Sequence, residues 1–193
     1  TCVPLRPVNG QWQLDLPALK SAITDKTRLL IVNSPNNPTG WTLTQAEQAE
    51  ILAHCRSTGT WVLADEVYER LYFENDTANG CAPSFLDVAH AEDRLVVVHS
   101  FSKSFLMTGW RLGFCANKKL APYFTNWITN TESCASHITQ WAGVEALNGP
   151  QDDANHMREV FLSRRNLIVS LLNDLPGVTC KTPGGAFYAW PNV

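Results

Sequence analysis

The sequence from Leu95 to Lys103 reads Leu-Val-Val-Val-His-Ser-Phe-Ser-Lys. Its apolar, largely β-branched beginning predicts a short buried strand, and the lysine follows the end of that strand. Two further apolar runs, Leu29–Val32 and Trp61–Ala64, precede it. Runs without polar alternation are typical of parallel strands covered on both faces. We therefore expect an α/β fold with a mostly parallel sheet sandwiched by helices.

Capping signals predict helices before and after the first of these strands. Asp15 can cap a helix that begins at Leu16. Thr44 and Glu47 have the spacing of a capping box, and Gly59 is placed to end the helix that the box begins. This alternation of helices and strands supports the α/β interpretation.

The remaining segments predict further elements. Cys2–Pro7 and Leu112–Ala116 are interpreted as strands, and Leu120–Asn148 as helical. Asp152 or Asp153 is expected to cap a long helix, whose apolar stripe from Met157 to Leu172 we interpret as core packing.

The end of the chain predicts the start of a second, smaller domain. Pro176 and Gly177 are expected to end the long helix. Val178–Cys180 and Ala186–Trp190 are then interpreted as strands of that smaller unit.

Composition narrows the classes of partner. The chain has 193 residues, 45% hydrophobic composition and a net charge of -3, with lysine and arginine dispersed. Nucleic acid binding is not expected, because it requires a basic stripe. No apolar run approaches the roughly 20 residues of a membrane span, so we expect no membrane association and a cytoplasmic location.

Cysteine and histidine spacing does not favour a metal. The six cysteines are scattered without a Cys-x-x-Cys pair, so we expect free, mostly buried thiols. Cys134 and His137 could share a helix face, but we identify no third metal ligand near them. We therefore expect no metal site.

Polar residues follow the three predicted parallel strands at the point where each strand ends. Asn37 follows the first strand, Asp65 the second and Lys103 the third. Because open α/β sheets bind ligands at the carboxyl edge of their strands, these side chains should meet in one crevice. Local roles are also open, since Asp65 can cap the next turn and Asn37 lies in an ordinary turn sequence.

The residue types at this edge fit one cofactor. A lysine that carries an aldehyde, a carboxylate that faces a ring nitrogen and an arginine that takes a phosphate are what a protein assembles around pyridoxal phosphate. Lys103, Asp65 and Arg111 supply these three groups.

Four segments carry a resemblance to a known family: Asn33–Gly40, Ala64–Tyr68, Ser100–Lys103 and Met107–Gly113. With them, the stretch from Val3 to Trp190 resembles the middle of a fold-type-I aminotransferase of class I/II. The resemblance implies a large cofactor-binding domain, in which the strand at Leu112–Ala116 runs antiparallel to its neighbours.

The resemblance also implies a role for each candidate residue. Lys103 would hold pyridoxal 5'-phosphate as a Schiff base and later move a proton as a free amine, and Asp65 would face the ring nitrogen. Tyr68 would hydrogen-bond the phenolic oxygen of the cofactor. Asn37 would share that task and reach the substrate carboxylate. The phosphate would be bound by Arg111 with Ser100 and Ser102.

The implied activity is transfer of an amino group from an amino acid to a 2-oxo acid. Three alternatives stay open at this point. The same residues would serve a carbon-sulfur β-lyase, an aminotransferase-like sensor domain of a transcription regulator, or a fragment with only a packing role.

Family members are nearly twice as long, so we interpret the chain as an internal fragment. Residues 1–150 would be a partial large domain, and 151–193 a connecting helix with the truncated start of the small domain. The family's phosphate loop, ring-stacking residue and substrate-carboxylate arginine would lie outside it. We therefore expect the fragment alone to be inactive and the intact protein to be a homodimer.

Overall fold

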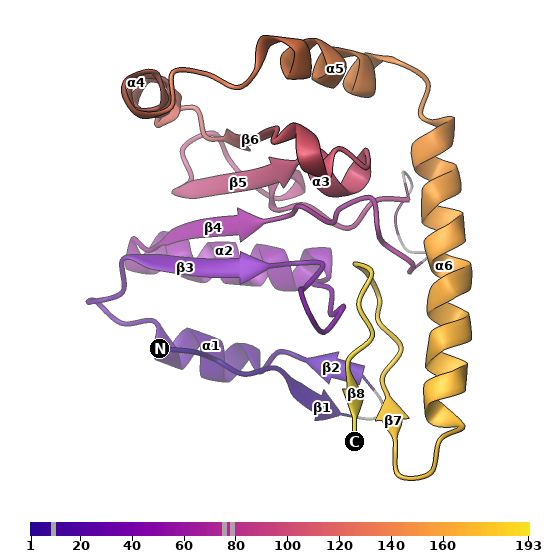
Figure 1. Ribbon diagram of the computed structural model, residues 1–193. Helices are drawn as coiled ribbons and strands as arrows, with labels where there is room; N and C mark the ends of the chain where they lie inside the picture. The colour runs from indigo at the N-terminus through magenta and orange to yellow at the C-terminus, as the bar shows by residue number, and fades with distance from the viewer. Residues whose placement is uncertain (9–10, 75–76, 78–79) are drawn as a thin grey trace.

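The computed structural model describes residues 1–8, 11–74, 77 and 80–193 (Figure 1). Its centre is a sheet with the strand order β3, β4, β5, β6. The strands span Leu29–Asn33, Trp61–Asp65, Leu95–Ser100 and Gly113–Ala116. The first three are parallel, and β6 is antiparallel to β5. This topology confirms the predicted mostly parallel α/β sheet and its antiparallel last strand.

The predicted capping signals act as expected at the helices beside the sheet. α1 spans Leu16–Ala22, and the Asp15 side chain accepts a hydrogen bond from the Ala18 amide at 2.9 Å. α2 spans Gln45–Thr58 and begins with a complete capping box between Thr44 and Glu47. It ends at Gly59, whose φ of 70° lies in the left-handed region that glycine tolerates best.

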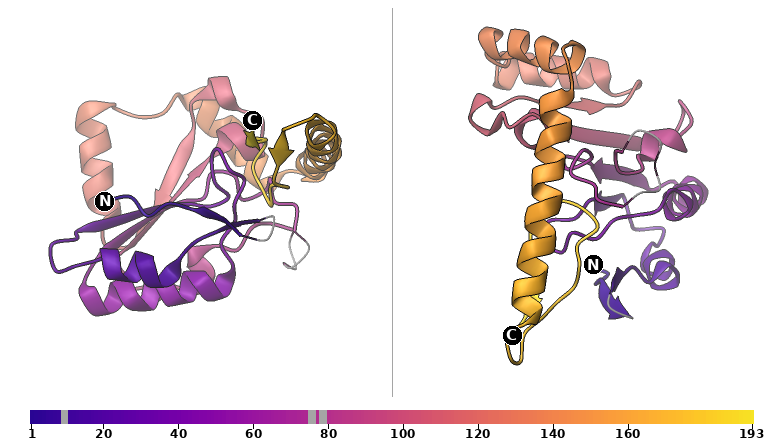
Figure 2. Two further views of the ribbon diagram at one scale, coloured as in Figure 1. Left: turned by 90° about the horizontal axis from the view of Figure 1, so that it is seen from below. Right: turned by 90° about the vertical axis from the view of Figure 1, so that its right-hand side faces the viewer.

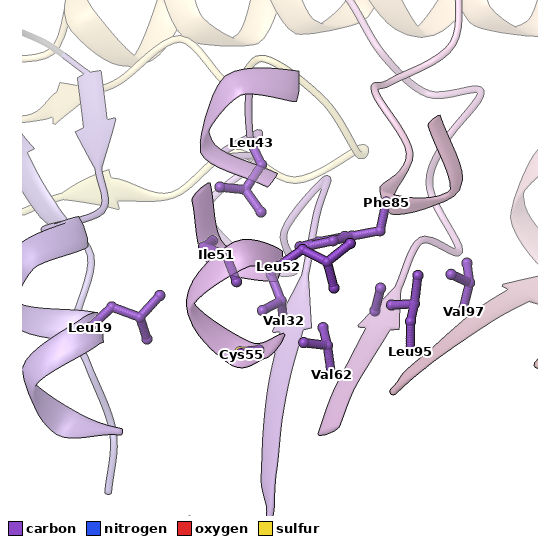
Figure 3. Packing of buried hydrophobic residues seen from close by; sticks show 11 residues of the cluster. Leu19, Val32, Leu43, Ile51, Leu52, Cys55, Val62, Phe85, Leu95 and Val97 are labelled. Carbon is purple, nitrogen blue, oxygen red and sulfur yellow. The ribbon is translucent and has the colours of Figure 1, made fainter. Parts of the chain in front are cut away.

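The main hydrophobic core lies between these helices and one face of the sheet (Figure 3). Ile51, Leu52 and Cys55 of α2 pack there with residues of β3, β4 and β5. Burying a large apolar side chain of this kind stabilises a fold by about 1.5–3 kcal/mol. On β3, Leu29 and Ile31 are 45% and 66% exposed. Strand β3 therefore has one buried face and one open face, and the expectation that this apolar run is covered on both faces is wrong for the described residues.

The N-terminal strand differs from its predicted bounds. β1 spans Arg6–Val8 and pairs antiparallel with β2, Gln11–Gln13. The prediction of a strand over Cys2–Pro7 is therefore wrong for residues 2–5. The partner strand β2 has three residues, which pair with Arg6, Pro7 and Val8, so the ladder does not extend to residues 2–5.

The predicted helical stretch from Leu120 to Asn148 is divided in two. α4 spans Ala121–Thr131 and α5 spans His137–Asn148. Between them Ser133 has a φ of 65°, which interrupts helical geometry. The preceding Thr129-Asn130-Thr131 is poor in helix propensity, and this explains why the helix ends there.

The long helix α6 spans Asp152–Asn173 and stands across the edge toward which β3, β4 and β5 point (Figures 1 and 2). The predicted cap is wrong, because Gln151 holds the N-cap position and makes no side-chain capping bond. Asp152 and Asp153 lie instead in the first turn, where their charges favour the helix dipole.

The core-packing interpretation of the α6 stripe is only partly right. Met157 and Val169 are buried. Leu167 and Leu171 are 61% and 53% exposed, although they belong to the same apolar pattern. The stripe therefore covers more of the helix than the described residues bury.

The C-terminal segment forms one short strand pair and one irregular stretch. β7, Thr179–Cys180, pairs antiparallel with β8, Pro191–Asn192. The strand predicted over Ala186–Trp190 is wrong, because the chain there follows an irregular path against the loops after β3 and β4. The Gly185 amide donates to the Gly40 carbonyl at 3.0 Å, and the Ala186 amide to the Leu71 carbonyl at 2.8 Å.

The cysteines of the described residues form no disulfide, but the expectation of mostly buried thiols is only partly met. Cys55 and Cys180 are buried, whereas Cys2, Cys115 and Cys134 are exposed. Within the described residues no three His, Cys, Asp or Glu side chains gather as metal ligands. None of the helices described here combines the length and apolar character of a membrane span.

Candidate active site

The loops after β3 and β4 are joined at the carboxyl edge of the sheet. Asn33, the last residue of β3, pairs in register with Asp65, the last residue of β4. Its side-chain amide donates to the Asp65 carbonyl at 3.1 Å, and its Oδ1 accepts from the Asn37 amide at 2.7 Å. The positions of Asn37 and Asp65 are thus set by the same asparagine.

Lys103 lies in α3, a short helix over Phe101–Ser104 that follows β5 directly. The Ser100 hydroxyl caps this helix by accepting from the Ser102 amide at 3.1 Å. Lys103 is half-buried, and its Nζ lies 5.7 Å from the centre of the Tyr68 ring and 5.2 Å from that of Phe187. Both distances are within the range of a cation–π contact. The ring centres are 5.4 Å apart, so the lysine amine lies beside both aromatic rings at the predicted edge.

Tyr68 is 3% exposed, and its hydroxyl lies 2.7 Å from the Tyr188 hydroxyl. The Asn37 side chain also hydrogen-bonds this group. Burial, followed by the Tyr188 hydrogen bond, raises the pKa of Tyr68 well above its usual range, although the Asn37 bond acts in the opposite direction. The hydroxyl therefore keeps its proton at neutral pH and can donate to an oxygen atom.

Asp65 is half-buried, and its Oδ1 accepts from the Val67 amide at 3.3 Å. The local capping role that the sequence left open is thus present. Among the described residues, no lysine or arginine forms an ion pair with this carboxylate. A half-buried carboxylate is stabilised by a cation, so Asp65 fits a protonated ring nitrogen.

The candidate phosphate ligands Ser100, Ser102 and Arg111 lie on the segment that connects β5 to β6 or at its start. Ser102 is buried, and its carbonyl accepts from the Thr108 hydroxyl at 3.1 Å. Thr108 begins the short 3-10 helix η2, Thr108–Trp110, and its carbonyl accepts from Arg111 at 2.9 Å. Gly113, two residues after Arg111, pairs in register with Ser100. Arg111 is exposed, so its guanidinium is accessible to an anion.

The seven candidate residues thus lie at the ends of β4 and β5 or in the segments that follow β3, β4 and β5, at one edge of the sheet. The structure brings together Lys103, Tyr68 and Asn37 by side-chain contacts, and it joins Ser102 and Arg111 through Thr108. Their assigned roles toward a cofactor stay predictions.

Sequence reasoning missed Phe187 and Tyr188 as members of this site. Phe187 contacts the Lys103 amine, and Tyr188 bonds Tyr68. The sequence signal is the pair Gly184-Gly185 before them, since glycine permits close backbone approach. A Cβ on Gly185 would lie 2.6 Å from Pro35, which shows how closely this segment packs on the loop after β3.

The fold and this edge define a class of protein: α/β proteins with lysine, carboxylate and arginine side chains at the carboxyl ends of parallel strands. More particularly, the chain belongs to the aminotransferase class I and II family, whose sequence model matches residues 2–193. This family uses pyridoxal phosphate. The match confirms the resemblance that the four motifs indicate.

Individual relatives agree with this assignment. The chain is 36% identical over 189 residues to the aspartate aminotransferase of Bacillus subtilis (strain 168). This alignment covers 95% of the chain and 46% of that protein. It is 39% identical over 186 residues to an aspartate/prephenate aminotransferase of Cereibacter sphaeroides, with 94% and 45% covered.

A solved structure supports the fold over nearly the whole chain. The crystal structure of an aromatic aminotransferase from Pyrococcus horikoshii OT3 matches with a TM-score of 0.89 at 33% identity. The match covers 99% of this chain and 50% of that one. The chain therefore spans about half the length of the relatives it matches.

Proposed function

We propose that the intact protein is an aminotransferase that moves an amino group from an amino acid to a 2-oxo acid, with pyridoxal phosphate attached at Lys103. The observation that carries this proposal is the position of Lys103, which is half-buried at the carboxyl edge of the sheet with its amine beside the rings of Tyr68 and Phe187. The relatives support the proposal, because each of those reported above is named as an aminotransferase.

The residues at this edge fit the cofactor. Asp65, which has no lysine or arginine ion-pair partner among the described residues, would face the ring nitrogen. Tyr68 would donate its hydroxyl proton to the phenolic oxygen, with Asn37 beside it. Ser100, Ser102 and Arg111 would bind the phosphate through hydroxyl groups and a guanidinium fork.

Once bound, pyridoxal phosphate supplies an electron sink for negative charge at the substrate α-carbon. The task of Lys103 Nζ in that chemistry is to accept and return the proton of this carbon. The rings of Tyr68 and Phe187 limit where the amine can lie, which favours proton transfer along one path. Asn37 is exposed and is proposed to reach the substrate carboxylate as well.

The wider organisation is proposed from the family. Residues 1–150 would belong to the cofactor-binding domain, and residues 151–193 would connect it to a smaller one. The intact protein is proposed to be a homodimer, and exposed apolar side chains of α4 and α5, such as Trp127 and Trp141, are surfaces that a partner could cover. A cytoplasmic location stays a prediction from the sequence.

A nitrogen-transfer assay on the intact protein tests the proposed reaction. The protein is incubated with pyridoxal phosphate, a ¹⁵N-labelled donor and an unlabelled 2-oxo acid, and the products are analysed by mass spectrometry. Aspartate and phenylalanine are suitable donors, because the names of relatives include aspartate and aromatic aminotransferases.

We expect the label in the amino acid formed from the 2-oxo acid, and no transfer by the Lys103→Ala variant. A β-lyase would instead release labelled ammonia from a β-substituted donor such as cystathionine, which the same assay includes. Ammonia release without transfer would contradict the aminotransferase proposal.

A further inference from the structure

A buried charged cluster lies beside the candidate site, between the turn after β4 and strand β5. Its most enclosed member is Glu66, whose side chain is 3% exposed. The Glu66 carboxylate accepts from the Ser84 hydroxyl at 2.6 Å and from the Phe85 amide at 2.8 Å. Its position is therefore fixed by two hydrogen bonds.

His99 lies between Glu66 and a second carboxylate, Glu69. Its Nδ1 is 3.0 Å from Glu69 Oε2, and its Nε2 is 3.6 Å from Glu66 Oε2. The imidazole stacks on Phe114 of β6, with ring centres 5.1 Å apart. The other carboxylate oxygen of Glu69 accepts from the Ser104 hydroxyl of α3 at 2.9 Å. His99 and Glu69 therefore connect the turn after β4, the segment of β5 and α3, and strand β6.

The surroundings favour the protonated form of the imidazole. Burial lowers the pKa of His99, but the hydrogen bond to Glu69 and the charges of Glu69, Glu66 and Asp65 raise it, so that the pKa lies above its ordinary value. These carboxylates come from β4 and the turn after it, while β6 and α3 contribute the uncharged Phe114 and Ser104. Nδ1 is within hydrogen-bond distance of Glu69, whereas Nε2 lies 3.6 Å from Glu66, which is an ion-pair distance. Only the imidazolium carries a proton on both nitrogens and a positive charge toward both carboxylates.

Members of the cluster are direct neighbours of candidate cofactor residues in the sequence. Glu66 follows Asp65, Glu69 follows Tyr68, and Ser104 follows Lys103. These three side chains are therefore attached to the same stretches of backbone as residues of the candidate site.

We propose that His99 is a positioning residue of this site, and that its imidazolium, held between Glu66 and Glu69, joins the turn that carries Tyr68 to the helix that carries Lys103. Without that cation, two carboxylates that share a buried region repel each other. The Glu69 side chain is the more exposed of the two, at 22% against 3% for Glu66, so we expect Glu69 to move. A displaced Glu69 no longer accepts the hydrogen bond from Ser104. The role of Lys103 rests on the proposed function, whereas the connection through His99 does not.

The first test uses His99→Gln, which keeps a polar side chain but cannot bear a charge. His156→Gln is the matched control, because His156 lies on α6 with a 76% exposed side chain. In each protein, the lysines are acetylated with a limiting amount of acetic anhydride, and the initial rate at Lys103 is divided by that at exposed Lys118. A role limited to overall stability would leave this ratio unchanged in the folded protein.

We expect at least a threefold change of the ratio in His99→Gln and less than a 1.5-fold change in His156→Gln. A ratio that stays within 1.5-fold of the unsubstituted protein in His99→Gln would overturn the proposal. The measurement needs no cofactor, so failure to trap pyridoxal phosphate at Lys103 would count against the proposed function alone.

A second test covers the case in which His99→Gln does not fold. In the unsubstituted protein, nitrogen NMR of the imidazole should show both ring nitrogens of His99 protonated at pH 7. Glu69→Gln keeps an acceptor for Ser104 but removes one charge, and it should lower the midpoint of the His99 titration and change the Lys103 ratio. A neutral His99 at pH 7 in the unsubstituted protein would contradict the proposal.

Discussion

At the scale of single residues, the carboxylate of Asp65 is the group whose chemistry is easiest to isolate. It is half-buried, and its charge is balanced by no lysine or arginine ion pair among the described residues. If it faces the ring nitrogen of pyridoxal phosphate, its removal should weaken the electron sink while leaving the lysine in place.

We predict that Asp65→Ala in the intact protein still traps pyridoxal phosphate at Lys103 but transaminates about a hundredfold more slowly or worse, a loss comparable to removing one electrostatic catalytic group. The rates are measured by the nitrogen-transfer assay. Asp25→Ala is the control, since Asp25 lies in an exposed turn. Undiminished transfer in Asp65→Ala would remove Asp65 from the mechanism.

Among the secondary-structure elements, helix α2 is connected to the segment before β5 by an ion pair between Arg56 and Asp93. Nε and Nη2 of Arg56 each donate to a carboxylate oxygen of Asp93 at 2.7 Å, and Asp93 also accepts from the His90 amide. The Arg56 hydrogen bond is the main cause that lowers the pKa of Asp93 below its usual value.

This pair predicts a pH dependence of stability. A carboxyl group with a lowered folded-state pKa stabilises the fold above its unfolded pKa of about 3.9, and that contribution is lost as pH falls through the folded value. Asp93→Asn should reduce the free energy of unfolding by about 1–2 kcal/mol at pH 7. In urea titrations, the difference from the unsubstituted protein should shrink toward zero below about pH 3.

The control for this prediction is Glu92→Gln, which removes an exposed carboxylate paired with Lys119. It should change the free energy of unfolding much less at pH 7. A loss in Asp93→Asn that is the same at pH 3 and pH 7 would show that the charge of Asp93 is not the cause.

A second prediction concerns Gly40, where the loop after β3 meets the C-terminal segment. Gly40 has a φ of 69°, and a Cβ there would collide with Pro183 and lie 2.8 Å from the Gly185 carbonyl oxygen. Gly40→Ala should reduce the free energy of unfolding by about 2–4 kcal/mol, through backbone strain and overpacking together. Urea unfolding provides the measurement.

Gly80→Ala separates these two causes, because Gly80 has nearly the same φ of 68° but open space around its Cβ position. We expect only the strain component there, about 1–2 kcal/mol. Faster amide exchange at Gly185 and Ala186 in Gly40→Ala would show that the segment next to Tyr68 has moved. Equal losses in the two variants would contradict the packing argument.

At the scale of the whole molecule, the features predicted correctly are those that depend on nearby residues. The capping box at Thr44 and the strand that precedes Lys103 can be recognised within a few residues, and strand direction then places Asn37, Asp65 and Lys103 at one edge. The family motifs lie in the same short segments, which is why the candidate site could be located from the sequence.

The features that sequence reasoning missed depend on contacts between distant residues. Gly185 bonds Gly40, and Tyr188 bonds Tyr68 across 120 positions, so no local pattern identifies either pair. The His99 cluster likewise joins β5 to a turn 30 residues earlier. The exposed stripe of α6 could not be foreseen, because helical periodicity predicts an apolar face but not what covers it.

The most direct test of the central claim is to locate the lysine that binds pyridoxal phosphate. The chain is incubated with the cofactor, reduced with borohydride and analysed by peptide mass spectrometry. We predict selective modification of Lys103, which is lost in Lys103→Ala and retained in Lys118→Ala. Modification spread evenly over the exposed lysines, or retained in full by Lys103→Ala, would contradict the assignment of Lys103 as the cofactor-binding residue.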